Sequence, residues 1–151
     1  MRMLLQRVLS ASVRVEGKIV GEIEQGLLIL VGLGQGDQEE IGQALLQKAM
    51  QLRIFEDEAG KMNRSLLEVG GGLLLVSQFT LYADCRKGRR PSFGEAMPPE
   101  EARVLFSRLV DIARQIEGVR VEAGIFGADM KVSLCNDGPV TIWLENEPPR
   151  P

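Results

Sequence analysis

The chain of 151 residues contains no histidine. This absence excludes Ser-His-Asp and Cys-His nucleophile systems, histidine general bases and histidine metal ligands. Cysteine is almost as rare: Cys85 and Cys135 lie far apart and form no Cys-x-x-Cys pair, which argues against a thiolate zinc site. We therefore expect two free cysteines, no metal and no cofactor.

Long apolar runs are absent as well. The stretch LLILVGL, residues 27–33, is far shorter than the roughly 20 residues needed to cross a bilayer and is typical of a buried strand. Arginines interrupt the N-terminal stretch MRMLLQRVLSASVRV, so a signal peptide is not expected. These features predict a cytoplasmic protein with no membrane partner.

An excess of positive charge is also missing, because the net charge is -3 and the pI is about 5.1. A protein that coats nucleic acid is usually basic, so any contact with nucleic acid is expected to be local. One stretch fits such a contact, the basic cluster RKGRR, whose charged members are Arg86, Lys87, Arg89 and Arg90. Alternatively, this cluster is simply a solvated surface.

The length suits a single domain, which we place at residues 1–146, with residues 147–151 as a frayed tail. Alternating and continuous apolar stretches predict several strands, and a Glu16-Gly17 turn predicts a hairpin between the first two. The fold class is therefore strand-rich α+β, with antiparallel or mixed sheets forming a barrel-like core and two packed helices.

The first helix is predicted to end near Gln51, with Asp37 as its capping residue. The second is predicted to open at Pro98-Pro99 and to end by Gly118. Helical spacing assigns the core face of the second helix to Val104, Leu105, Leu109, Ile112 and Ile116.

Generic nucleotide motifs are not found. GLGQGD, residues 32–37, follows a strand but matches neither G-x-G-x-x-G nor G-x-x-x-x-G-K-[ST], so we interpret it as a tight turn. Two other stretches are candidates for function. SQFTL, residues 77–81, ends an apolar strand and opens a loop of about 20 residues, a length typical of functional or disordered loops. Its Ser and Thr also suit simple local hydrogen bonding at a strand end.

The second candidate is NDGPVT, residues 136–141, which lies between the strand-like stretches KVSLC and IWLEN. An Asp-Gly hairpin normally continues directly into its return strand, but here Pro139 follows Gly138. Proline has no N–H to donate to a sheet. The residues alone leave two interpretations open: an unusual hairpin with an edge or bulge proline, or a functional element.

Four separated motifs occur together: SQFTL, RPSF at residues 90–93, FGADM at residues 126–130, and NDGPVT. With them the chain resembles the D-aminoacyl-tRNA deacylase family over essentially its whole length, from LLQRVLSASV to NDGPVTIWLE. The resemblance implies an enzyme that hydrolyses the ester bond of D-aminoacyl-tRNA and releases the D-amino acid and the tRNA. It also implies a homodimer.

The resemblance assigns roles to particular residues. It places Ser77, Gln78, Phe79 and Thr80 around the 3′-terminal adenosine and the aminoacyl group. It implies that Gly138-Pro139, in the cis form, reaches into the pocket of the partner subunit and that Arg7 orients this dipeptide. Two backbone carbonyls there would leave no space for an L side chain. D-aminoacyl and glycyl substrates would then be accepted.

Hydrolysis without histidine is reasonable for this substrate, because an aminoacyl ester is already activated. Backbone N–H groups near Ser77 to Thr80 are natural donors to an oxyanion. Thr80 as a covalent nucleophile is the competing hypothesis, but the sequence shows no base to activate it. Two other functions stay open: a non-catalytic nucleic-acid-binding module that uses the basic cluster, and a hydrolase of small acylated molecules.

Overall fold

A long first strand organises the sheet in the computed structural model, which describes residues 1–147. The first half of β1 (Arg2–Val15) pairs antiparallel with β3 (Gly26–Gly32), and its second half pairs with β2 (Lys18–Ile23). The other edge of β1 pairs along nearly its whole length with β8 (Lys131–Glu145). The predicted hairpin at Glu16-Gly17 is confirmed by the β1–β2 pairing.

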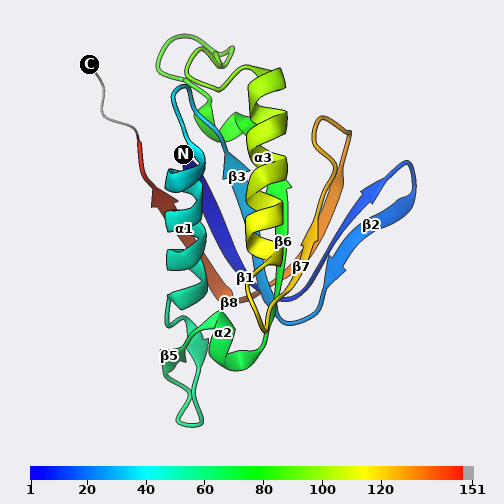
Figure 1. The fold of residues 1–151 in the computed structure, drawn as a ribbon, viewed down its shortest axis with the longest axis vertical. Coiled ribbons are helices and arrows are strands. Elements are labelled where there is room, and N and C mark those ends of the chain that lie inside the picture. The colour runs from blue at the N-terminus through cyan, green and yellow to red at the C-terminus, as the bar shows by residue number, and fades with distance from the viewer. Residues whose placement is uncertain (148–151) are drawn as a thin grey trace.

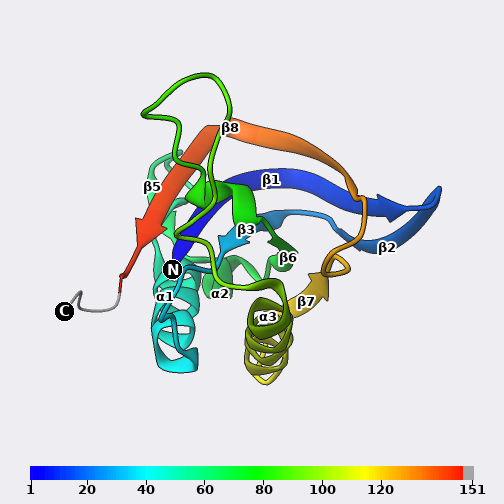
Figure 2. The ribbon, with the colours of Figure 1, turned by 90° about the horizontal axis from the view of Figure 1, so that it is seen from above.

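Parallel pairing completes the sheet. β3 runs parallel to β6 (Gly72–Ser77), which runs parallel to β7 (Arg120–Ala123), so the strand order is β2-β1-β3-β6-β7 with β8 on β1. The sheet curls until β2 approaches β7 (Figure 2): a Cβ built on Gly21 would lie 2.9 Å from the carbonyl oxygen of Ala123. The predicted mixed, barrel-like α+β fold is confirmed.

Two helices, α1 (Glu39–Gln51) and α3 (Pro99–Arg114), lie next to each other on one side of the curved sheet (Figure 1). Side chains on alternate positions of the central strands face different clusters. Leu27 and Ile29 pack with the helices, whereas Leu28 and Leu74 face the inside of the curl. Both faces of β3 are thus covered, which is why its sequence is continuously apolar.

The predicted core face of α3 is confirmed at four of its five residues, because Leu109 is buried and Leu105, Ile112 and Ile116 pack against the core; Val104 is the exception. Val104 is 64% exposed, while Phe106 and Val110, which the spacing did not include, are buried. The buried positions of α3 are Ala102, Phe106, Leu109, Val110 and Ala113. The error at Val104 arises because an apolar residue on a helix surface fits the same spacing template as a core residue.

Short elements fill the connection between α1 and β6. β4 (Phe55–Glu56) and β5 (Met62–Arg64) form a small hairpin. α2 (Leu66–Val69) follows, and Ser65 with Glu68 forms a complete capping box at its start. A 3₁₀ helix, η1 (Phe79–Tyr82), then continues the chain after β6. Of the expected frayed tail, residues 148–151 lie outside the described residues.

Candidate functional site

A cavity of about 700 Å³ opens at the carboxyl ends of the parallel strands. Val31 near the end of β3, Ser77 at the end of β6 and Phe126 after β7 all line it. Ligands commonly bind beyond the carboxyl ends of parallel strands, because the following loops diverge there. The start of α3, with Pro98 and Pro99, forms another wall.

The SQFTL motif supplies three lining residues, Ser77, Gln78 and Phe79. The ring of Phe79 is 58% exposed and meets the ring of Phe93 edge to face, with centroids 5.0 Å apart. Phe93 also lines the cavity. An exposed aromatic pair at the mouth of an apolar cavity is a surface on which a planar ring can pack.

Thr80, the fourth predicted residue of this motif, is exposed and lies beside the cavity lining rather than in it. Its hydroxyl oxygen accepts a hydrogen bond from the Nε2 amide of Gln78. A neutral amide donor does not remove a proton, so this contact does not activate the hydroxyl as a nucleophile.

The FGADM motif forms the opposite wall, and the whole stretch Phe126–Met130 lines the cavity. Among residues 1–147, Asp129 is the only charged residue that lines the cavity, and its carboxylate is paired with Lys131 Nζ at 2.9 Å. Arg103 on α3 holds this wall, because its guanidinium lies 5.0 Å from the Phe126 ring centre and Nη1 donates to the Phe126 carbonyl. No role for FGADM was predicted from its residues alone, and only the resemblance singled it out.

The η1 helix that carries Phe79 and Thr80 is held at both ends. At its start, the Gln78 N–H donates to the Val31 carbonyl at 2.8 Å. At its end, Arg2 Nη1 donates to the Leu81 carbonyl at 2.9 Å. The side chain of Tyr82 is buried, and this burial raises the pKa of its phenol.

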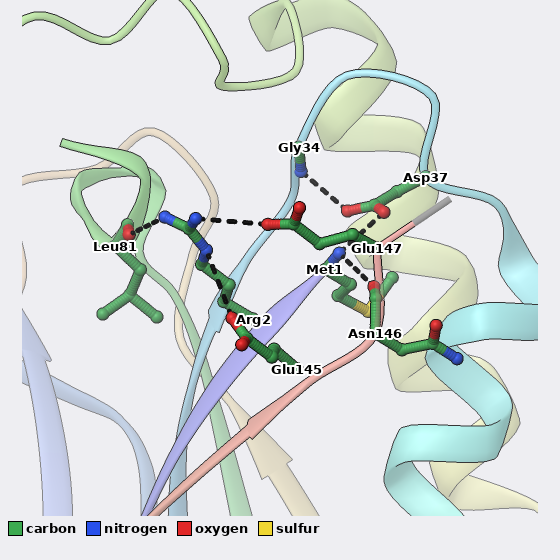
Figure 3. Close-up of polar contacts among 8 residues, drawn as sticks. All are labelled: Met1, Arg2, Gly34, Asp37, Leu81, Glu145, Asn146 and Glu147. Carbon is green, nitrogen blue, oxygen red and sulfur yellow. Dashed lines mark hydrogen bonds and ion pairs between the residues drawn. The ribbon is translucent and has the colours of Figure 1, made fainter. Parts of the chain in front are cut away.

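A second buried contact fixes the turn beside η1 (Figure 3). The α-ammonium of Met1 donates to Asp37 Oδ1 at 2.7 Å and to the Asn146 carbonyl at 2.7 Å. Asp37 Oδ2 accepts from the Gly34 N–H at 2.7 Å. Both members of the Met1–Asp37 ion pair are fully buried. The prediction that Asp37 caps α1 is therefore wrong: Gln38 is the N-cap residue, and Asp37 is engaged by the chain's first residue.

NDGPVT is not a hairpin, because β8 runs through it and both flanking stretches pair with β1. Between the Gln6–Thr141 and Val8–Asn136 pairs, β1 contributes only Arg7 whereas β8 contributes residues 137–140. The motif is therefore a large bulge in a continuous strand, and the Gly138-Pro139 bond within it is cis. The interpretation as an unusual hairpin is therefore wrong, although the proline does lie in a bulge.

Arg7 holds this bulge from the facing strand. Its side chain is almost fully buried; Nε donates to the Asp137 carbonyl at 3.1 Å, and Nη1 donates to the Ile54 carbonyl at 2.7 Å. The Asp137 carboxylate lies 3.4 Å from Nε and balances the buried charge. Gly138 and Pro139 do not line the 700 Å³ cavity of their own chain, so within one chain the structure separates the two predicted parts of the site.

The basic cluster lies on an exposed loop. Asp84 and Ser92 close the base of this loop through two backbone hydrogen bonds of 2.8 and 3.0 Å, which lead the chain directly to Phe93 at the cavity. Arg86 folds back onto Asp84 and lowers the pKa of that carboxyl to about 2. Lys87, Arg89 and Arg90 are exposed.

Two kinds of feature are absent from residues 1–147, a metal-binding cluster and a membrane-spanning helix. No group of three His, Cys, Asp or Glu side chains in this part of the chain could hold a metal ion. No helix there is long and apolar enough to cross a membrane. Cys85 and Cys135 are both free and exposed, as predicted.

Comparison with known proteins connects this architecture to a family. The profile of the D-Tyr-tRNA(Tyr) deacylase family matches residues 4–145. A D-aminoacyl-tRNA deacylase of Thermomicrobium roseum is 62% identical over 146 residues, covering 97% of this chain and 94% of the relative. The corresponding protein of Solidesulfovibrio magneticus is 58% identical, covering 97% of this chain and 96% of the relative.

Two solved structures share this fold. A protein described as a c-Myc DNA unwinding element binding protein superimposes with a TM-score of 0.88 at 36% identity, covering 98% of this chain and all of the other. A probable eukaryotic D-amino acid tRNA deacylase shares the fold, with a TM-score of 0.78 at 20% identity over 95% of this chain and 97% of the other. The chain therefore belongs to the D-aminoacyl-tRNA deacylase family and is an enzyme of that class.

Proposed function

We propose that this enzyme hydrolyses the ester bond of D-aminoacyl-tRNA, releasing the D-amino acid and the tRNA, and that it also cleaves glycyl-tRNA but rejects L-aminoacyl-tRNA. The observation that carries the proposal is the cavity at the carboxyl ends of β3 and β6, lined by Ser77, Gln78 and Phe79. Family membership supplies the reaction class. An aminoacyl-tRNA substrate favours a cytoplasmic location, and residues 1–146 would form the single deacylase domain.

The cavity suits the 3′ end of a tRNA. Its lining is largely apolar and aromatic, and the pair Phe79–Phe93 lies at its mouth. Unstacked bases bind to proteins by packing against aromatic side chains, so we place the 3′-terminal adenine near this pair. The aminoacyl group would then lie deeper, towards Ser77 and the start of η1.

The backbone at the start of η1 would stabilise the oxyanion. The first N–H groups of a helix have no partner within it. The Gln78 N–H donates to Val31, so we assign the N–H groups of Phe79 and Thr80 as the donors. A positioned water would attack the ester carbon, and the neighbouring ribose hydroxyl of the substrate would assist proton transfer.

Thr80 therefore does not act as a covalent nucleophile in this proposal. We expect Thr80→Ala to lower kcat by at most about tenfold, whereas loss of a true nucleophile costs roughly 10⁶-fold in a well-studied hydrolase. The measurement is D-tyrosyl-tRNA deacylation at saturating substrate, with circular dichroism to show that the variant folds. A folded but inactive variant, together with an acyl-threonine trapped on the unmodified enzyme, would contradict the backbone mechanism.

Chiral selection would come from Gly138-Pro139 of a second subunit. Three observations support a homodimer that places this dipeptide in the partner's cavity. The dipeptide lies outside its own chain's cavity, its bulge is fixed by the buried Arg7, and the outer edge of β8 pairs with no strand of residues 1–147. Leu134 and Trp143 on β8 are also exposed, at 37% and 44%. Light scattering on the assayed sample would detect the dimer.

The basic cluster would bind the tRNA backbone without taking part in hydrolysis. Because Arg86 is engaged by Asp84, Arg89 and Arg90 provide the clearer test. We expect the double change Arg89→Ala/Arg90→Ala to weaken tRNA binding and to reduce the slope of log affinity against log salt by about one to two, as for one or two lost phosphate contacts. Arg114→Ala/Arg120→Ala is the matched control, because both arginines are exposed and lie at the ends of α3 and β7 that are remote from the cavity. An unchanged slope would identify the cluster as plain solvated surface.

A second candidate function is nucleic-acid binding without catalysis. It is favoured by the likeness to the c-Myc DNA unwinding element binding protein, together with the exposed basic cluster. Purified protein incubated with D-tyrosyl-tRNA distinguishes the two candidates. A deacylase releases D-tyrosine over many turnovers, whereas a binding module retards the tRNA in a gel and releases none. A hydrolase of small acyl esters would cleave D-tyrosine ethyl ester equally well.

A further inference from the structure

We propose that Arg2 is a positioning residue for deacylation: its guanidinium fixes the η1 helix (Phe79–Tyr82) in the geometry that the reaction needs. The inference rests on the proposed function, because it concerns the same cavity. Arg2 does not line the cavity, so it would act through η1 and not on the substrate.

The position of Arg2 in the sheet explains why it reaches η1. It is the first residue of β1 and pairs with Gly32 at the end of β3 on one edge and with Glu145 at the end of β8 on the other. η1 packs directly over this corner: a Cβ built on Gly32 would lie 2.9 Å from the Cβ of Leu81. A long side chain leaving β1 here therefore meets the carboxyl end of η1.

The guanidinium contacts two separate parts of the chain, the end of η1 and the residues at and just after the end of β8 (Figure 3). Nη1 donates to the Leu81 carbonyl at 2.9 Å, and Nη2 donates to Glu147 Oε1 at 3.1 Å. Nε lies 3.9 Å from Glu145 Oε2. The planar fork of arginine allows these contacts at once, and the two carboxylates orient it so that Nη1 is directed at η1.

These contacts stabilise η1 in two ways. The last carbonyls of a helix lack partners within it, and Arg2 satisfies the one on Leu81. The guanidinium carbon also lies 4.3 Å from the centre of the Tyr82 ring, so the charge packs on the face of that buried aromatic. The first N–H groups of the same short helix are the proposed oxyanion donors, and one rigid turn separates them from the Arg2 contact.

Because misplacement by about 1 Å can cost about a hundredfold in rate, loosening η1 is expected to affect the chemical step. We expect Arg2→Gln to lower kcat for D-tyrosyl-tRNA by about ten- to a hundredfold, with KM changed by less than about threefold. Arg2→Lys keeps the charge but has no planar fork, so its kcat should lie between those of Arg2→Gln and the unmodified enzyme.

Arg108→Gln is the matched control. Arg108 also donates two hydrogen bonds to a carboxylate, that of Glu39, but it joins α1 to α3 away from η1. Hydrogen exchange provides the readout that a general loss of stability does not reproduce. Amides of residues 78–83 should exchange faster in Arg2→Gln and be unchanged in Arg108→Gln, at a temperature where both variants are folded.

Each of the following results tests the proposed positioning role of Arg2. Retained kcat in a folded Arg2→Gln variant, unchanged exchange of residues 78–83, or an equal kcat loss in Arg108→Gln would overturn it. If Arg2→Gln does not fold, Arg2→Lys gives the same two measurements. An unmodified enzyme that fails to deacylate D-tyrosyl-tRNA would refute the proposed function instead, and the exchange experiment would still decide whether Arg2 fixes η1.

Discussion

Replacement of Asp37 by alanine is expected to lower the free energy of unfolding by about 3–5 kcal/mol, the usual cost of removing one partner from a buried ion pair. The carboxylate accepts from the Met1 ammonium and from the Gly34 N–H, each at 2.7 Å, and the ion pair is fully buried. Its removal leaves a charged donor and a backbone donor without this acceptor. Urea denaturation followed by circular dichroism measures the loss.

A matched substitution tests whether burial of the ion pair causes this loss of stability. Asp129→Ala removes an ion pair of similar length, 2.9 Å to Lys131, but both side chains are more than 70% exposed. We expect this variant to lose no more than about 1 kcal/mol, because solvent screens exposed pairs. Equal losses in the two variants would mean that the Met1–Asp37 contact contributes no more than an ordinary surface pair.

The second large effect concerns the stereochemistry of the substrate. D-tyrosyl-tRNA, D-aspartyl-tRNA and glycyl-tRNA are all expected to be deacylated, whereas L-tyrosyl-tRNA is expected to be refused. In the proposed mechanism the Gly138-Pro139 carbonyls occupy the space that an L side chain would need. A steric conflict of about 1–3 kcal/mol corresponds to roughly five- to 160-fold in kcat/KM, so the L substrate should be slower by at least about fivefold. Initial rates on the four charged tRNAs, corrected for spontaneous hydrolysis, measure the ratios.

Glycyl-tRNA is the informative member of this series. Glycine has no side chain to collide with the carbonyls, so exclusion by steric conflict leaves it a substrate. Refusal of glycyl-tRNA under conditions where D-tyrosyl-tRNA turns over would show that the enzyme recognises a D side chain through positive contacts. Arg7→Ala provides the structural counterpart: loss of the bonds to the Asp137 and Ile54 carbonyls should release the bulge and lower the D-to-L ratio.

The sequence predicted those parts of the fold that depend on local pattern. Three predicted features depend only on neighbouring residues, and all three are found in the structure. They are the continuous apolar stretch of β3, the Glu16-Gly17 turn and the prolines that open α3. The capping box of Ser65 and Glu68 follows an equally local pattern, the sequence SLLE. It was not predicted, because it lies in a polar, glycine-rich connection.

The sequence did not predict contacts that are made across the fold. Asp37 satisfies the local rule for a helix cap, yet the ammonium of Met1 competes for it after β1 and β3 have brought the two together. Arg2 and Arg103 show no local pattern at all, because their partners at Leu81 and Phe126 are distant in sequence. The stretch with the cavity residues Ser77, Gln78 and Phe79 was a candidate from its place at the end of a strand, but its role was assigned only through motifs shared with a family.

The pairing of β1 with β8 has a consequence for how the protein is made. The sheet joins residues 2–14 to residues 131–145, so β1 gains its partner on one edge only after residues 131–145 have left the ribosome. Contacts between such distant segments slow folding, since a long loop must close before they form. Until then β1 presents an unpaired apolar edge to other nascent chains. Pairing of β8 with β1, rather than assembly of the helices, is therefore the step that removes this edge from aggregation with other chains.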